Sequence, residues 1–109
     1  MDMKNEILSV ISTVASQADA DRLARGLVEA RLAACVQVES GLVSHYRWQG
    51  ALAAEPEWRL TAKTIPARLA ALREWLAAHH PYEVPQLTWV PMQAEPAYAA
   101  WVVSELSVP

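Results

Sequence analysis

The chain has 109 residues, with no phenylalanine, three glycines and a single cysteine, Cys35. One cysteine excludes an intrachain disulfide and a cysteine-rich zinc site. No apolar run approaches the ~20 residues that cross a bilayer. The nine Lys and Arg residues form no cluster that could follow a phosphate backbone, and the formal charge is −3. We therefore expect neither a membrane nor a nucleic acid as a partner.

Signals of catalysis and export are also missing. The chain contains no glycine-rich phosphate loop, paired-carboxylate motif or nucleophile elbow, so we expect a protein that is not an enzyme. Cys35, between two small apolar residues, is typical of a buried thiol rather than a nucleophile. The first six residues include two acidic ones, unlike the basic start of a secretory signal, which predicts a cytoplasmic protein.

Apolar residues, in contrast, are abundant. They make up 53% of the chain, and they include five tryptophans, which we interpret mainly as core and interface residues. The length predicts one domain over residues 1–109. Because 53% exceeds the usual share in soluble domains, the composition also predicts an interface with another subunit.

The first half of the chain predicts a strand, a helix and a long hairpin. Residues 7–13 are short, apolar and β-branched, as in a buried strand. Ser16 is a predicted helix cap, followed by a one-sided stripe. The stripe comprises Ala20, Leu23, Ala24, Leu27, Ala30 and Ala34. Strand patterns over 35–48 and 57–64 flank a turn at 48–50; Gly41 predicts a bulge and Pro56 an edge or bulge.

The second half predicts a helix, a strand and a short third helix. The second helix begins at Pro66 after a predicted Thr64 cap and ends before Pro81. Its stripe comprises Leu69, Leu72, Leu76 and His79. Residues 87–92 predict a strand, and Pro96 begins a helix that points four residues inward, Tyr98, Trp101, Val102 and Leu106.

This order predicts an α+β fold of the ferredoxin-like βαββαβ type, with a long bent β-hairpin and a short C-terminal helix. Both crossover helices cover the same face of the antiparallel sheet. The other face then needs a second copy of the chain to cover it, so an oligomer is expected.

The connector 79–85, His-His-Pro-Tyr-Glu-Val-Pro, holds the polar residues that suit a site. His79 is interpreted as a core histidine or a metal ligand, and His80 as either with equal weight. Tyr82 and Glu83 could act beside Lys63 as acid, base and anion anchor if the connector folds over the strand end. Hydrogen bonds that fix a cleft between subunits are the alternative role for these groups.

Several motifs together resemble the CutA divalent-cation tolerance proteins. They are Ala30-Arg31-Leu32-Ala33-Ala34-Cys35-Val36, Tyr46-Arg47-Trp48-Gln49-Gly50, Lys63-Thr64 and the connector 79–85. The resemblance spans residues 7–106. It implies a homotrimer with similarity to the PII signalling fold. It also implies copper binding by two connector histidines and a cysteine at the end of the first strand, positions held here by His79, His80 and Ser12.

Ser12 changes the expected metal chemistry, because a neutral hydroxyl is a poor ligand for copper where a thiolate is a strong one. The first hypothesis is a trimer that binds copper or another divalent cation, weakly, through His79 and His80, with Ser12 a doubtful ligand. The second is a PII-like sensor of a small anion in intersubunit clefts lined by Lys63, Tyr82 and Glu83. The third is a structural trimer without a ligand.

Overall fold

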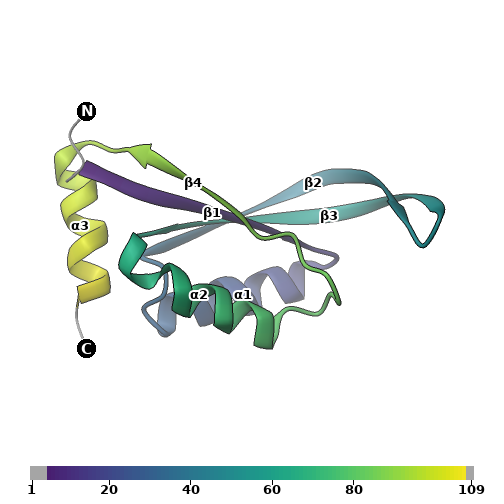
Figure 1. The fold of residues 1–109 in the computed structure, drawn as a ribbon, viewed down its shortest axis with the longest axis horizontal. Helices are drawn as coiled ribbons and strands as arrows, with labels where there is room; N and C mark the ends of the chain where they lie inside the picture. The colour runs from purple at the N-terminus through teal and green to yellow at the C-terminus, as the bar shows by residue number, and fades with distance from the viewer. Residues whose placement is uncertain (1–4, 108–109) are drawn as a thin grey trace.

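The computed structural model describes residues 5–107, so the ends of the expected domain, 1–4 and 108–109, lie outside the described residues. The elements follow in the order β1 (Glu6–Val14), α1 (Gln17–Glu29), β2 (Cys35–Trp48), β3 (Ala51–Thr64), α2 (Pro66–His79), β4 (Thr88–Gln93) and α3 (Pro96–Ser107). The strands form an antiparallel sheet in the order β2-β3-β1-β4. The ferredoxin-like prediction is confirmed (Figure 1). Within residues 5–107 no helix is long and apolar enough to cross a bilayer.

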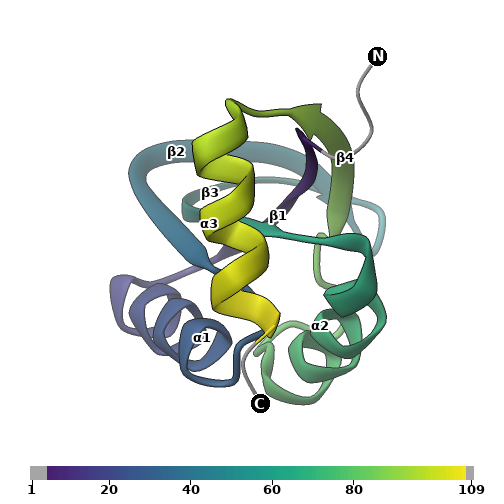
Figure 2. The ribbon, with the colours of Figure 1, turned by 90° about the vertical axis from the view of Figure 1, so that its left-hand side faces the viewer.

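The main core lies between the sheet and the two crossover helices, which cover the same face (Figures 1 and 2). It is built from alternate residues of β1 and β3 and from the inner stripes of α1 and α2. Its most buried members include Val10, Val14, Leu23, Leu27, Leu60 and Leu72. A second cluster joins α3 to the start of β1, where Ile7 packs with Ala99, Val102 and Leu106. Figure 2 shows α3 crossing the end of the sheet rather than lying on the helix layer.

β2 and β3 continue past the end of β1 as a two-stranded arm (Figure 1). β3 pairs with β1 only from Trp58 to Thr64, whereas its pairing with β2 reaches the turn. Pro56 therefore lies where β3 has a neighbour on one side only, as expected for an edge. The pairing slips between Glu39 and Leu42, and Gly41 there has φ 84°, so the predicted bulge is confirmed.

The helix ends differ from the sequence prediction in two places. Ser16 caps α1 as predicted, accepting a hydrogen bond from Asp19 N at 3.1 Å. α1 ends at Glu29, however, so Ala30 and Ala34 are not part of its stripe. Thr64 is not the cap of α2. Its buried Oγ1 donates to the Leu32 carbonyl at 2.7 Å, and α2 follows Ile65 without a side-chain cap.

Two predictions of inward-facing aromatics in α3 are wrong for the single chain. Tyr98 is 39% exposed and Trp101 is 42% exposed, while Ala99 and Val102 take the buried positions. The two aromatic rings lie 5.7 Å apart between centroids on the outer side of the helix. The predicted inward stripe is therefore displaced by one residue at the start of α3, where Ala99 is buried instead of Tyr98.

Candidate functional site

The connector between α2 and β4 passes the end of β1, and His80 attaches it there. His80 Nε2 lies 3.0 Å from the Thr13 carbonyl and 3.1 Å from Ser12 Oγ. Its Nδ1 accepts a hydrogen bond from the backbone N–H of Tyr82 at 3.1 Å. Ser12 Oγ in turn donates to the Gln86 carbonyl at 2.7 Å. The connector is thereby tied to β1 through His80 near its start and through Gln86, the residue that follows its end.

These bonds select one form of the His80 imidazole. Because Nδ1 accepts from an N–H, the ring proton must be on Nε2, where it points at the Thr13 carbonyl. Burial lowers the pKa of His80 below its usual value, partly opposed by the hydrogen bond to Thr13. The neutral ring satisfies all its partners, and neither nitrogen has a free lone pair for a metal.

His79 has the opposite environment. The sequence placed it on the buried stripe of α2, but its side chain is exposed, so the interpretation as a core histidine is wrong. The ring stacks on Trp75 at 4.1 Å between centroids, and its Nδ1 lies 2.7 Å from the Trp75 carbonyl. Because a carbonyl only accepts, Nδ1 carries the proton. Nε2 then keeps its lone pair and has no partner among residues 5–107.

A three-ligand metal site is not assembled within the described part of the chain. There, no group of three or more His, Cys, Asp or Glu side chains is placed to hold an ion. His80 and Ser12 do lie together, but as hydrogen-bond partners. The set His79, His80 and Ser12 therefore does not fit a metal as a unit within one chain, and only His79 has a donor atom available.

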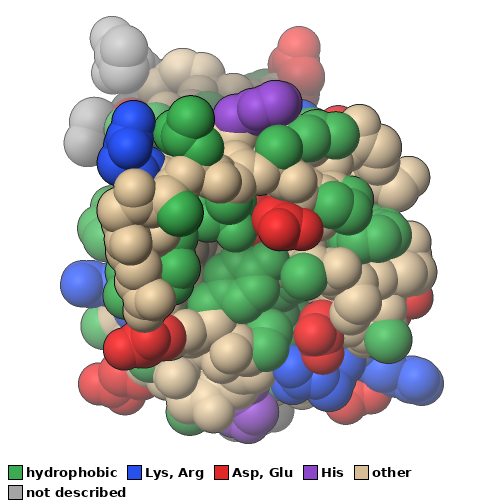
Figure 3. All heavy atoms as spheres, turned by 90° about the vertical axis from the view of Figure 1, so that its right-hand side faces the viewer, with side chains coloured by type: hydrophobic (Ala, Val, Ile, Leu, Met, Phe, Trp, Pro, Cys, Tyr) green, Lys and Arg blue, Asp and Glu red, His purple; other side chains and the backbone are tan. Residues whose placement is uncertain are grey.

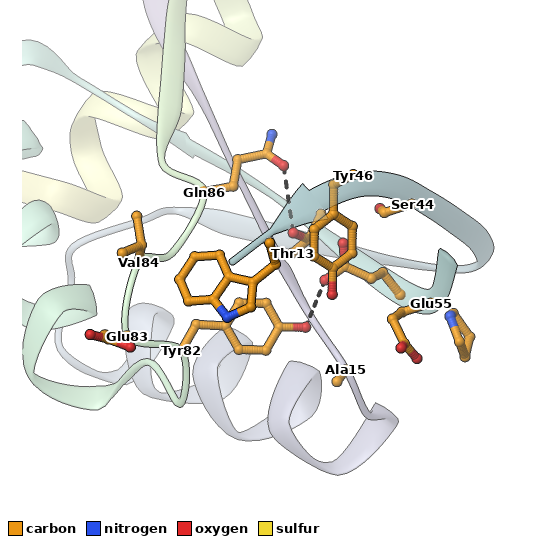
Figure 4. Close-up of a pocket in the computed structure, with 12 residues that line it drawn as sticks. Thr13, Ala15, Ser44, Tyr46, Glu55, Tyr82, Glu83, Val84 and Gln86 are labelled. Atoms are coloured by element: carbon orange, nitrogen blue, oxygen red, sulfur yellow. Dashed lines mark hydrogen bonds between the residues drawn. The ribbon is translucent and has the colours of Figure 1, made fainter. Parts of the chain in front are cut away.

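A pocket of about 590 Å³ opens between the arm and the connector (Figure 4). Tyr82 and Glu83 line it from the connector, as the cleft hypothesis expected. Lys63 does not join them: its Nζ donates to Gln37 at 3.1 Å, and it lies six residues along β3 from Glu57 of the pocket. The other lining residues are Thr13, Ala15, Ser44, Tyr46, Trp48, Glu55, Pro56, Glu57, Val84 and Gln86.

Tyr82 joins the connector to the arm. Its hydroxyl donates to Glu57 Oε2 at 2.7 Å, and Glu57 is only 8% exposed. Burial, together with this bond to a carboxylate, raises the pKa of the Tyr82 phenol well above its usual value. The phenol therefore stays protonated and acts as a donor that orients Glu57, not as an acid or base near neutral pH.

Sequence reasoning missed the contribution of the arm to this pocket. Tyr46 and Trp48 alternate along β2, and Glu55 and Glu57 alternate along β3. Alternation predicts that each pair shares a face of its strand. The register that brings Ser44 opposite Glu55 then puts both pairs on the same face of the arm. The alternation of the hairpin residues was visible in the sequence. The connector that completes the pocket could not be paired with them, because Tyr82 lies 25 residues after Glu57.

Comparison with known proteins identifies the same family that the sequence motifs resemble. Residues 8–105 match the model of the CutA1 divalent ion tolerance protein. The divalent-cation tolerance protein CutA of Thermus thermophilus is 40% identical over 94 residues, 85% of this chain and 91% of that protein.

Two solved structures show the same fold. CutA from Synechococcus elongatus has a TM-score of 0.88 and 39% identity, covering 94% of this chain and 91% of that one. CutA1 from Ehrlichia chaffeensis has a TM-score of 0.90 and 27% identity, covering 98% and 100%. With the family model matched over nearly the whole chain, the protein belongs to the CutA1 family of divalent ion tolerance proteins.

Proposed function

We propose that this protein is a non-enzymatic homotrimer that binds copper or another divalent cation, with His79 as its imidazole ligand. The supporting observation is the hydrogen bond made by one nitrogen of the ring, Nδ1, which leaves the other for a metal. Histidines that ligate metals usually donate their other N–H to a carbonyl or carboxylate, which fixes the ring and its tautomer. The bond from His79 Nδ1 to the Trp75 carbonyl has this form and leaves Nε2 accessible.

A single imidazole is too few for stable binding, so the remaining ligands come from another subunit or from water. Oligomerisation is supported by the large apolar side chains on the surface of the single chain. They include Val43, Tyr46, Trp48, Leu52, Val84, Trp89, Val90, Met92, Tyr98, Trp101 and Val103. Such extensive exposure is unusual for a monomer and typical of a subunit interface.

The anion-sensor alternative has less support. Within residues 5–107 the pocket is lined by three carboxylates and by no Lys or Arg, and carboxylates repel an anionic ligand. Lys63, the proposed anchor, is held by Gln37 away from this lining. A cation is therefore the better match to the charge of this pocket.

The three histidines of the chain allow a matched test. We expect calorimetric titration with copper to give binding in the wild-type protein, loss of that binding in His79→Ala, and retention in His45→Ala, which removes an exposed histidine of the arm. His80→Gln should also retain it, because His80 has no free nitrogen. Equal heats from wild type and His79→Ala would exclude the proposed ligand.

The homotrimer is tested separately by size exclusion with light scattering. The expected mass is about three times the 12.0 kDa of the chain. A stable monomer would contradict the assembly, since the exposed apolar residues would then remain in water.

A further inference from the structure

A single residue of α2, Trp75, contacts the ring of His79 in two ways. The backbone carbonyl of Trp75 lies 2.7 Å from Nδ1 of His79 and accepts a hydrogen bond from it. The indole of Trp75 stacks on the imidazole, with 4.1 Å between the ring centroids and 17° between the ring planes. Residues four apart lie on the same side of a helix, which makes both contacts possible at once. The carbonyl sets which nitrogen carries the proton, and the indole sets the plane of the ring.

The indole is itself held in place by the core and by α1. Trp75 packs against the main core, and its six-membered ring lies over Gly26. A Cβ atom at Gly26 would come within 2.5 Å of Cζ2 and 2.6 Å of Cη2 of Trp75. Glycine in a helix interior is destabilising relative to alanine, and Gly26 does not have the positive φ that would require glycine. The glycine is therefore explained by the space that the indole needs.

The stacked indole matters because the side chain of His79 is exposed. An exposed side chain samples several rotamers unless a neighbour restricts it. One hydrogen bond on the protein surface competes with water and holds a ring only weakly. Figure 3 shows histidine side chains at two separate places on the face seen from the arm end, not in a cluster. The stack with Trp75 therefore restricts the His79 ring to the orientation in which Nδ1 meets the carbonyl.

We propose that Trp75, packed on Gly26, is the positioning residue for His79, holding the imidazole in the Nδ1–H form so that the lone pair of Nε2 is kept for a ligand. A free imidazole favours the other tautomer, which carries its proton on Nε2 and has no lone pair there. A ring that is already oriented loses less freedom when a ligand binds. The use of this lone pair by a cation rests on the proposed function, whereas the tautomer and the orientation of the ring exist without metal.

The tautomer can be measured in the metal-free protein by ¹⁵N NMR of the imidazole nitrogens at pH 8. We expect wild-type His79 to be mainly in the Nδ1–H form. Trp75→Leu keeps the backbone carbonyl but removes the stacking ring, so the ratio of the Nε2–H form to the Nδ1–H form should increase by at least about threefold. Gly26→Ala, which displaces the indole from α1, should shift the ratio in the same direction. Trp75→Phe keeps a stacking ring and should retain the Nδ1–H form.

Leu69→Ala is the matched control, because Leu69 is a partly buried residue of the same helix that is not part of the stack. It should lower stability and leave the tautomer unchanged, which separates positioning from a general loss of structure. Calorimetric titration with copper gives a second measurement. Trp75→Leu should weaken copper binding by about fivefold, while Trp75→Phe and Leu69→Ala should stay within about twofold of the wild type.

Two results would overturn the proposal. A wild-type His79 with its proton on Nε2 would show that the Trp75 carbonyl does not select the tautomer. An unchanged Nδ1–H population in Trp75→Leu would show that the carbonyl alone holds the ring and that the indole does not position it. Because the tautomer is measured without metal, a failure of copper binding alone would refute the proposed function and leave the positioning of His79 unaffected.

Discussion

Replacement of His80 should be far more damaging than replacement of His79, the reverse of what the helical stripe predicts. His80→Ala removes the acceptor of the Tyr82 N–H and the donor to the Thr13 carbonyl. At about 1 kcal/mol for each hydrogen bond, plus the lost packing of a half-buried ring, the free energy of unfolding should fall by about 2–3 kcal/mol. His79→Ala removes one bond from an exposed ring and should cost about 0.5 kcal/mol.

The measurement is urea unfolding at pH 8, at equal protomer concentrations so that any contribution of assembly to stability is the same for each variant. Loss of stability in His79→Ala equal to that in His80→Ala would refute the assignment of the two rings. The fold of each variant is checked by circular dichroism before unfolding.

The same bonds give His80 a defined dependence on pH. Its folded pKa is lowered, so the unfolded chain binds the proton first as pH falls below about 6.5. Stability should be constant above about pH 7 and should decrease below it, by at most about 1.4 kcal/mol per pH unit from this group. NMR titration of the ring should show a midpoint below that of a free histidine, and a midpoint above it would contradict the neutral tautomer.

Three further substitutions test the packing around the site. Gly26→Ala should destabilise the protein by about 1 kcal/mol in urea unfolding, because a methyl there would lie 2.5 Å from Trp75 Cζ2 and overpacking outweighs the gain in helix propensity. Thr64→Val should cost about 1–2 kcal/mol by the same measurement, since it leaves the Leu32 carbonyl without its donor. Arg68→Met removes both hydrogen bonds to the last turn of α3, so hydrogen exchange should accelerate in α3 and remain unchanged in α1.

Most of the fold could be predicted because local signals and the hydrophobic pattern agree. The Ser16 cap, the bulge at Gly41 and the helix start at Pro66 each have a local physical cause, and each is found in the structure. The order of elements then leaves few topologies to choose from. Thr64 shows the limit of local reasoning, because a buried carbonyl 32 residues away takes the hydroxyl that a cap would use.

The site could be predicted only in part, because its geometry depends on where one helix ends. α2 stops at His79, and His80 has extended backbone with φ −72° and ψ 137°. Adjacent residues across such a break point in different directions, so His79 turns to solvent while His80 turns to β1. The periodicity of α2 places His79 within the helix, but wrongly on its buried face, and contains no information about the next residue.

Ser12 explains why the two rings differ in chemistry as well as in position. A hydroxyl both donates and accepts, so Ser12 can hold the Gln86 carbonyl and receive His80 at the same time. A thiol makes weaker hydrogen bonds and would not fasten both ends of the connector equally well, whereas a thiolate would be the better copper ligand. With serine at position 12, the end of β1 holds the connector in place. Both nitrogens of His80 then form hydrogen bonds and are not available to a metal. The proposed copper site must then use His79 rather than His80, and separate substitutions of the two rings distinguish them.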